Sequence, residues 1–212
     1  MSDLQRVFIH EIGHLVAAEL NYRLYNYDRR IEKLTLYPRN STAFFNGEVY
    51  TSKANKDKYF VETCANEYVQ TFYGCLFEVI YRKLELNKCL CYRFTKEKNV
   101  EHLKENLYNG VADAHQLNYI GARKELNKIS SLWHDYTHDI YITEMNSLVN
   151  HFDMVFEMDI NDFILEKLEY NGYSINIEKL VSSLNSFLDL HSPFYKSLLE
   201  KLYDIQNIKN QK

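Results

Sequence analysis

Two histidines and a glutamate near the start of the sequence have the spacing of a metal site. They lie in the run His10-Glu11-Ile12-Gly13-His14, which is an HExxH pattern. Histidines four residues apart lie one turn apart on the same face of an α-helix, so both imidazoles can bind one Zn²⁺ at about 2.0–2.1 Å. Glu11 points to the adjacent part of that face, where it can reach a metal-bound water without binding the metal.

This arrangement predicts hydrolytic chemistry. Zn²⁺ lowers the pKa of a bound water toward about 7. Glu11 would accept the proton and pass it to the leaving amine, acting first as general base and then as general acid. Gly13 costs about 1 kcal/mol relative to Ala inside a helix, which makes sense if another group must approach the helix backbone closely.

The competing interpretation is a chance match, because the chain contains 8 histidines and short motifs produce false positives. The helical context and the apolar residues around the run favour the metal site. Ser2 to Gln5 has the form of a capping box, and apolar residues then recur at helical spacing. This pattern predicts a helix from about Asp3 to Leu20.

The rest of the sequence predicts further helices and a small β element. Residues 31–37 predict a strand, and residues 47–51 predict its antiparallel partner. A helical pattern returns from Lys58 to about Leu84. Asp113 is expected to open another helix that runs past Leu126.

The last third predicts three or four helices, one ending at Asn171-Gly172 and the final one starting at Ser192-Pro193. We therefore expect a mainly α fold with a small two- or three-stranded β element. Residues 1–130 would form the zinc-binding core, and residues 131–212 would form the helical C-terminal part of the same domain.

Composition narrows the class of protein. The chain has 212 residues, 46% of them apolar and 25% charged, with a formal net charge of −4. That charge gives no reason to expect nucleic acid. No segment reaches the roughly 18 apolar residues of a membrane span, and no signal peptide is visible. Four cysteines suggest reduced thiols and a cytoplasmic location. The 18 Tyr and 12 Phe are expected in the core and its rim.

A catalytic zinc site needs a third protein ligand and an open position for water. The longer HExxHxxGxxH pattern is excluded, because Ala17 and Leu20 occupy its glycine and third histidine positions. Another type of zinc site uses a glutamate ligand within an NExxxD pattern. Asn66-Glu67 matches the start of this pattern, but Thr71 stands where the aspartate should be, so Glu67 is a weak candidate.

The first 130 residues or so resemble the peptidase domain of the FtsH-type ATP-dependent zinc proteases. The resemblance covers five segments in the same order: Phe8–Ala17, Ile31–Arg39, Gly47–Thr51, Gly74–Ile80 and Gly110–Ala122. The histidine motif and the strand that ends in Pro38-Arg39 are its specific parts. The resemblance implies a zincin-type HExxH helix within an FtsH peptidase-like helical domain.

The resemblance also implies roles for particular residues. Asp113 would be the third zinc ligand, although an aspartate at a helix start can also be a simple N-cap. Glu78 would be an alternative ligand, or a partner that orients a metal-binding histidine. In this family the strand after the first helix is an edge that pairs with an extended peptide. The residues Leu34, Thr35, Leu36 and Tyr37 would bind substrate this way, or form an ordinary hairpin.

We therefore expect a zinc-dependent endopeptidase that cleaves unfolded or extended polypeptides. The alternative is a zinc-stabilised but catalytically inactive binding or regulatory domain of the same fold. No GxxxxGK[ST] phosphate loop occurs in the sequence, so an ATPase or adaptor partner would act in trans. The resemblance also implies assembly as a homo-oligomer, since family members assemble as rings.

Two further groups are weaker candidates. His134 and His138 are spaced like a second metal pair but lack a glutamate after the first histidine. A solvated or core-edge pair is the more ordinary interpretation. Cys89 and Cys91 lack a matching second cysteine pair.

Overall fold

The computed structural model describes residues 2–38, 45–51, 64–83 and 151–210, and five single positions between them. Those positions are Asp113, Gln116, Leu117, Tyr136 and Asp139. The principal elements are α1 (Asp3–Tyr25), β1 (Ile31–Pro38), β2 (Phe45–Thr51), α2 (Cys64–Tyr81), β3 (Ile164–Lys167), β4 (Tyr173–Ile175) and α6 (Ile177–Asn210). The prediction of a mainly helical chain with a small sheet is confirmed.

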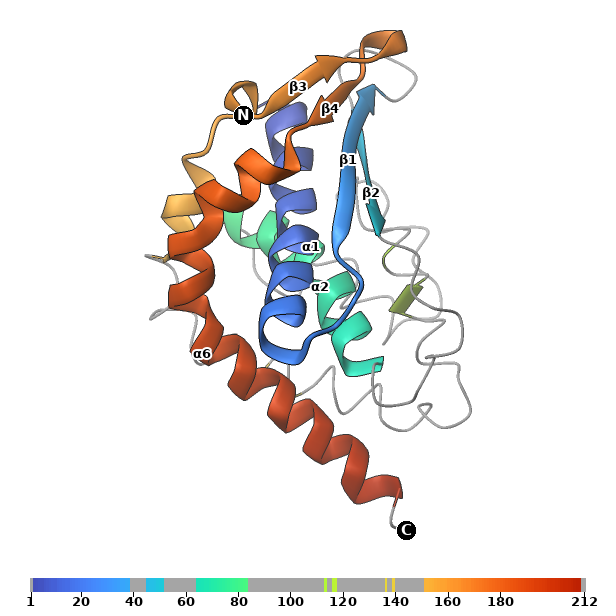
Figure 1. The fold of residues 1–212 in the computed structure, drawn as a ribbon, viewed down its shortest axis with the longest axis vertical. Coiled ribbons are helices and arrows are strands. Elements are labelled where there is room, and N and C mark those ends of the chain that lie inside the picture. The colour runs from blue at the N-terminus through green and yellow to red at the C-terminus, as the bar shows by residue number, and fades with distance from the viewer. Residues whose placement is uncertain are drawn as a thin grey trace.

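Helix α1 lies at the centre of the fold (Figure 1), packed against α2, β1, β2 and α6. Every residue from Arg6 to Asn21 is buried. A helix that is apolar on nearly all sides is expected in such a position. The helix continues beyond the predicted end at Leu20 to Tyr25, and Asn26 stops it in a left-handed conformation.

The start of α1 is capped as its sequence predicts. The backbone N–H of Gln5 donates to Ser2 Oγ at 3.2 Å. The Gln5 side chain does not return to Ser2, as a complete capping box requires. It donates instead to the Met158 carbonyl and accepts from the Ile160 N–H. The first turn of α1 is thereby attached to the segment that precedes β3.

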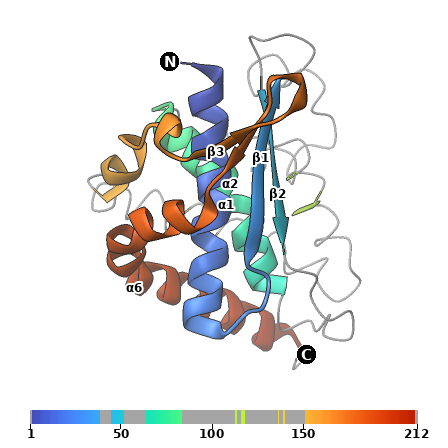
Figure 2. The same cartoon turned by 45° about the horizontal axis from the view of Figure 1, so that its top comes forward.

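The strands form one antiparallel sheet in the order β2-β1-β4-β3. Figure 2 shows this sheet beside α1. The predicted pairing of β1 with β2 is confirmed, with Leu36 opposite Gly47. The predicted limit of three strands is wrong, because β3 and β4 come from a region where we expected only helices. These strands have only four and three residues, too few to show a clear alternating pattern.

The Asn171-Gly172 pair ends only the short 3-10 helix η6 (Glu169–Asn171) and not one of the predicted α-helices. It lies in the connection between β3 and β4, where Tyr170 and Asn171 adopt left-handed backbone conformations. Asn and Gly favour both helix ends and tight turns for the same conformational reason. The dipeptide therefore predicts a chain reversal without showing which elements it joins.

Two interpretations are open for Leu34–Tyr37, a strand edge that pairs with a peptide and an ordinary hairpin, and the observed strand pairing favours the hairpin. Strand β1 pairs with β2 along its length and with β4 at Thr35 and Leu36. The backbone at these two positions is therefore engaged on both sides. Within the described residues, β2 is the strand at this end of the sheet.

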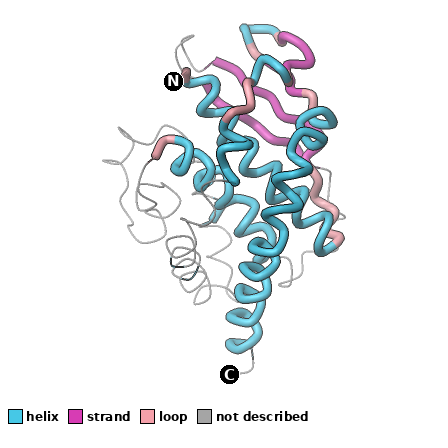
Figure 3. The backbone as a smooth tube through the Cα atoms, turned by 90° about the vertical axis from the view of Figure 1, so that its left-hand side faces the viewer, coloured by secondary structure: helices cyan, strands magenta, loops and turns pink. Residues whose placement is uncertain are grey.

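Helices α2 and α6 cover other sides of α1, and Figure 3 shows the length of α6 down to the C-terminus. The predicted helix start at Ser192-Pro193 is wrong, because α6 continues through both residues. Proline removes one helical hydrogen bond and bends a helix. The Ser192 hydroxyl donates to the Leu188 carbonyl at 2.7 Å, and Figure 1 shows α6 changing direction along its length.

Aromatic residues fill the space between α2, α6 and residues 151–156. The rings of Phe77, Phe152 and Phe187 lie 5.0–5.9 Å apart between centroids. The prediction that many Phe and Tyr serve as core is confirmed for the described residues. None of the described helices is both long and apolar enough to cross a bilayer.

Candidate metal centre

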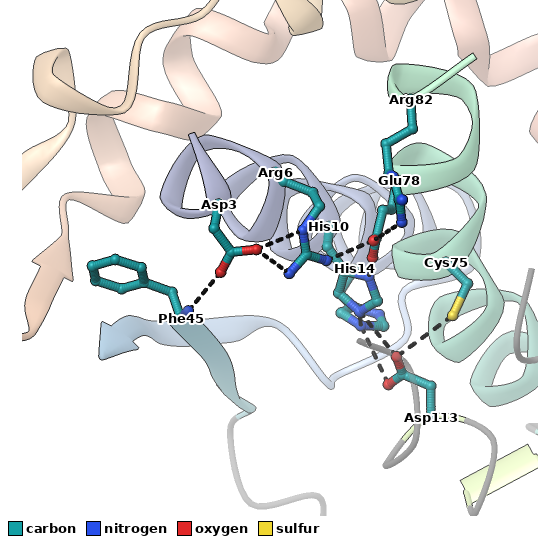
Figure 4. A network of polar contacts seen from close by, with 9 residues as sticks. All are labelled: Asp3, Arg6, His10, His14, Phe45, Cys75, Glu78, Arg82 and Asp113. Carbon is teal, nitrogen blue, oxygen red and sulfur yellow. Dashed lines mark hydrogen bonds and ion pairs between the residues drawn. The ribbon is translucent and has the colours of Figure 1, made fainter. Parts of the chain in front are cut away.

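His10 and His14 on α1 meet Asp113 at one point of the structure. Asp113 Oδ2 lies 2.9 Å from His10 Nε2, and Asp113 Oδ1 lies 3.4 Å from His14 Nε2. The two imidazole Nε2 atoms are 3.3 Å apart. The three donor atoms lie within 4.8 Å of one another, and Figure 4 shows them converging. The structure thus brings together all three residues predicted as metal ligands.

The other ring nitrogens of the two histidines face hydrogen-bond acceptors. His10 Nδ1 lies 3.0 Å from a Glu78 carboxylate oxygen, and His14 Nδ1 lies 2.8 Å from the Gln70 carbonyl oxygen. Both Nδ1 atoms must therefore carry a proton. In the neutral imidazoles, each Nε2 then presents a lone pair toward the other and toward Asp113. A cation placed between these atoms relieves the repulsion, so the residues present fit a metal ion.

The electrostatics of the isolated side chains lead to the same conclusion. Burial lowers the pKa of His10, but hydrogen bonds to Asp113 and Glu78 outweigh burial and raise that pKa well above its usual value. Burial likewise lowers the pKa of His14, and Asp113 outweighs it. Burial favours protonated Asp113, yet the two imidazoles hold its pKa far below the usual range. The site therefore favours positive charge at its centre.

Two glycines allow the helices to approach at this point. A Cβ at Gly74 on α2 would lie 2.3 Å from His14 Nε2 and 2.8 Å from His10 Nε2. A Cβ at Gly13 on α1 would lie 2.3 Å from the Tyr73 carbonyl oxygen. The close backbone approach that Gly13 suggested is therefore present, and it comes from α2.

Glu11 lies next to the three donors but is not one of them. It is buried, and a Cβ at Gly47 on β2 would lie 2.2 Å from its Oε1. No described residue forms a hydrogen bond with its carboxylate. Burial raises the pKa of Glu11, and the nearby His10 and His14 oppose that shift. The Glu11 carboxylate thus lies between the histidine pair and strand β2.

Glu78 contacts the histidine from outside the donor cluster. It reaches His10 through Nδ1 and not through the converging Nε2 side. Its other oxygen accepts hydrogen bonds from Arg6 at 2.6 Å and from Arg82 at 3.3 Å. Burial raises the pKa of Glu78, but His10 and Arg6 outweigh it and lower that pKa. Of its two predicted roles, the geometry favours the orienting partner over the ligand.

Among the described residues, the donor cluster consists of His10, His14 and Asp113. Cys75 Sγ lies 3.8 Å from Asp113 Oδ2 but is not part of the cluster. A catalytic zinc site typically has three protein ligands and one open position, whereas a structural site has four.

Other sequence candidates lie elsewhere or outside the described residues. Glu67, the weak alternative ligand, binds Arg29 at 2.9 Å and Tyr27 at 3.3 Å. Leu34, Thr35 and Leu36 are buried within the sheet, and Tyr37 is half-buried. The pairs His134/His138 and Cys89/Cys91 lie outside the described residues.

Sequence reasoning missed Asp3, Arg6, Gly47 and Gly74. The spacing of Asp3 and Arg6 is a helical ion-pair spacing, which gives no hint that Arg6 reaches Glu78. Gly47 and Gly74 both lie in segments that resemble the family, but their contacts with Glu11 and the histidines depend on tertiary packing.

No protein family, curated protein or solved structure matches this chain.

Proposed function

We propose that this protein is a zinc-dependent endopeptidase. The observation that carries the proposal is the convergence of His10 Nε2, His14 Nε2 and the Asp113 carboxylate beside a buried glutamate. His10, His14 and Asp113 would hold the ion. A bound zinc ion supplies a Lewis acid that activates water and polarises a carbonyl group.

Glu11 is the general base in this proposal. Its carboxylate would accept a proton from the attacking water and return it to the nitrogen of the leaving amine. Three features support the role: its position beside the histidines, its burial, and the lack of a competing hydrogen bond from a described residue. Glu78 and the Gln70 carbonyl would keep both Nδ1 atoms protonated, and so leave the Nε2 lone pairs for the ion.

The substrate would be an extended polypeptide segment that pairs with β2. Strand β2 ends the described sheet, and its Gly47 lies against Glu11. A peptide added to this edge would run past the general base and bind through backbone hydrogen bonds, which are largely independent of sequence. This position replaces β1, whose Thr35 and Leu36 are already paired on both sides.

The resemblance to FtsH-type peptidase domains is part of the same proposal. It supports an unfolded polypeptide as substrate, an ATPase or adaptor partner in trans, and assembly as a homo-oligomer. A cytoplasmic location also belongs to the proposal. It is supported by the cysteine content, because four cysteines in a chain of 212 residues suggest reduced thiols.

A metal-stabilised binding domain without turnover is the rival function. One observation favours it, namely the approach of Cys75 Sγ to within 3.8 Å of Asp113 Oδ2. A small movement of that thiol would add a fourth protein donor and close the site. Glu11 opposes this rival, because a closed site has no use for a general base.

The substitution Glu11→Gln tests the peptidase function. It keeps the side-chain volume and the three metal ligands, so zinc content should stay at one ion per chain. Cleavage of an unstructured peptide should fall by roughly 10²–10⁴-fold, the usual contribution of general base catalysis. Glu19→Gln is the matched control, since Glu19 is a buried carboxylate on the same helix that pairs with Arg30 away from the site. Undiminished cleavage by Glu11→Gln would sink the proposed mechanism.

A further inference from the structure

A line of hydrogen-bonded charged groups connects the metal ligand His10 to strand β2 (Figure 4). His10 Nδ1 lies 3.0 Å from Glu78 Oε2, and Glu78 Oε1 accepts from Arg6 Nη1 at 2.6 Å. Arg6 Nε and Nη2 both donate to Asp3 Oδ1, at 2.9 and 2.7 Å. Asp3 Oδ2 then accepts the backbone N–H of Phe45 at 2.6 Å.

The inner part of this line is buried. Arg6 is 6% exposed and Glu78 is 5% exposed, while the Asp3 side chain is 16% exposed. Charge-assisted hydrogen bonds are short and strongly directional when they are removed from water. Breaking one of them leaves a buried charge without its partner, which is strongly unfavourable. The groups therefore restrict each other's positions.

The guanidinium of Arg6 joins the two halves of the line. Its planar fork donates to Asp3 through one edge and to Glu78 through Nη1. Lysine has the same charge but lacks a fixed fork, so it cannot hold both carboxylates in a defined geometry. Arg82 also reaches Glu78, but at 3.3 Å and from a side chain that is 25% exposed. Arg6 is thus the principal buried cation beside Glu78.

The outer end of the line fixes the start of β2. Phe45 is the first residue of β2 and pairs with Pro38 of β1. Its ring lies 6.3 Å from the ring of Tyr173 on β4. Two residues further along β2, Gly47 lies against Glu11. The same strand therefore contacts the polar line at one residue and the general base at another.

We propose that Asp3 and Arg6 are positioning residues that hold strand β2 and the metal ligand His10 in one fixed geometry. Arg6 orients Glu78, which orients the His10 ring, and Asp3 both orients Arg6 and anchors the first residue of β2. The role in peptide alignment rests on the proposed peptidase function. The role in metal binding does not, and it follows from the contacts with His10 alone.

Metal affinity tests the positioning role without any enzyme assay. Competition with a chelator gives the zinc affinity, and the visible absorption of the cobalt-loaded protein reports the geometry of the ligands. Glu78→Gln should weaken zinc binding roughly ten- to a hundredfold, as is usual for the partner of a metal-binding histidine. Arg6→Lys should weaken it less, about five- to tenfold, and Asp3→Ala should weaken it least. The cobalt spectrum should change in the same order.

Ser2→Ala is the matched control. The Ser2 hydroxyl caps the same turn of α1 through the Gln5 N–H. The Ser2 carbonyl accepts the backbone N–H of Arg6 at 3.2 Å, and alanine keeps that carbonyl. The substitution should lower the melting temperature while leaving zinc affinity and the cobalt spectrum unchanged. Melting temperatures of all four variants separate loss of folding from loss of metal geometry.

Peptide cleavage then tests the contact between Asp3 and the start of β2. Asp3→Ala frees the start of β2, so it should raise KM for an unstructured peptide by more than Arg6→Lys does. Zinc affinities for Arg6→Lys and Asp3→Ala equal to that of Ser2→Ala would overturn the proposal, because the charged line would then only stabilise the fold. Weakened zinc binding in a protein that shows no cleavage would support the positioning role while refuting the peptidase function.

Discussion

Two regions of this protein bury histidines at similar depth but in opposite chemical surroundings. At the α1–α2 contact, His10 and His14 face the carboxylates of Asp113 and Glu78. At the α2–α6 contact, His191 lies among Tyr73, Phe152, Phe187 and Phe194, with ring centroids 5.1–5.9 Å away. Its Nε2 bonds the Tyr73 hydroxyl at 2.9 Å, and no described group bonds its Nδ1.

The pKa of each histidine follows its surroundings. Burial and the neighbouring His151 lower the pKa of His191 to about 3. The carboxylates near His10 and His14 overcome burial and raise the pKa of both. A histidine that is buried without a carboxylate partner is therefore a neutral core residue. A candidate metal ligand is distinguished by acceptors on one ring nitrogen and converging donors at the other.

The largest expected effect distinguishes the two regions by metal binding. His14→Ala removes one of three converging donors, so zinc affinity should fall by more than the ten- to hundredfold typical of losing an orienting partner. His191→Phe keeps an aromatic ring in an aromatic cluster and should leave zinc affinity unchanged. Equilibrium dialysis of both variants measures the difference. Equal zinc binding by His14→Ala and wild type would contradict the assignment.

Substitution of two glycines on opposite sides of the site should have different effects on zinc binding and cleavage. Gly74→Ala places a methyl group against the Nε2 atoms of both histidines, so zinc binding should be lost. Gly47→Ala places a methyl group against the Glu11 carboxylate, which should move the base away, retain zinc and abolish most cleavage. Zinc content and peptide cleavage are measured on both variants. Retained zinc in Gly74→Ala would show that the donors meet elsewhere.

The pH dependence of the free energy of unfolding should show the titration of the buried His191. The pKa of His191 falls from about 6.5 to about 3 on folding, so the unfolded chain binds its proton first as pH decreases. Its contribution to stability is complete above about pH 6.5 and is lost toward pH 3, by up to ~1.4 kcal/mol per pH unit. Denaturant unfolding of the metal-free wild type and of His191→Phe isolates this slope. Parallel pH profiles would show that His191 does not titrate as described.

A small effect is expected at a hydrogen bond between α6 and α1, one helical turn after His191. The Tyr195 hydroxyl on α6 donates to Asn21 Oδ1 on α1 at 2.8 Å, within the buried core. Tyr195→Phe should lower the free energy of unfolding by about 1 kcal/mol, the usual net value of one hydrogen bond. Zinc affinity should not change. A loss of zinc binding would mean that the α1–α6 contact also sets the metal geometry.

Local patterns predicted much of this arrangement. The cap at Ser2, the helical spacing and the HExxH run place both histidines on one helix. The β1–β2 hairpin also follows from local pattern. The assignment of Asp113 rested mainly on the family resemblance, because an aspartate at a helix start is also a common N-cap.

Features that depend on tertiary contacts were missed. The charged line from Asp3 to Glu78 joins residues far apart in the chain, so no local pattern contains it. Strands β3 and β4 are too short for a clear period, and without β4 the central position of β1 was not foreseeable. Pro193 has a strong local preference to start a helix, but packing of α6 keeps the helix continuous around it.

The most direct test of the central claim is X-ray absorption at the zinc edge of the zinc-loaded protein. The proposed site predicts one ion per chain with only nitrogen and oxygen donors at about 2.0–2.1 Å, two of them histidines, and a fourth position filled by water. A sulfur neighbour at about 2.3 Å would contradict the claim. It would mean that Cys75 closes the site, and that the metal stabilises a binding domain instead of serving a peptidase.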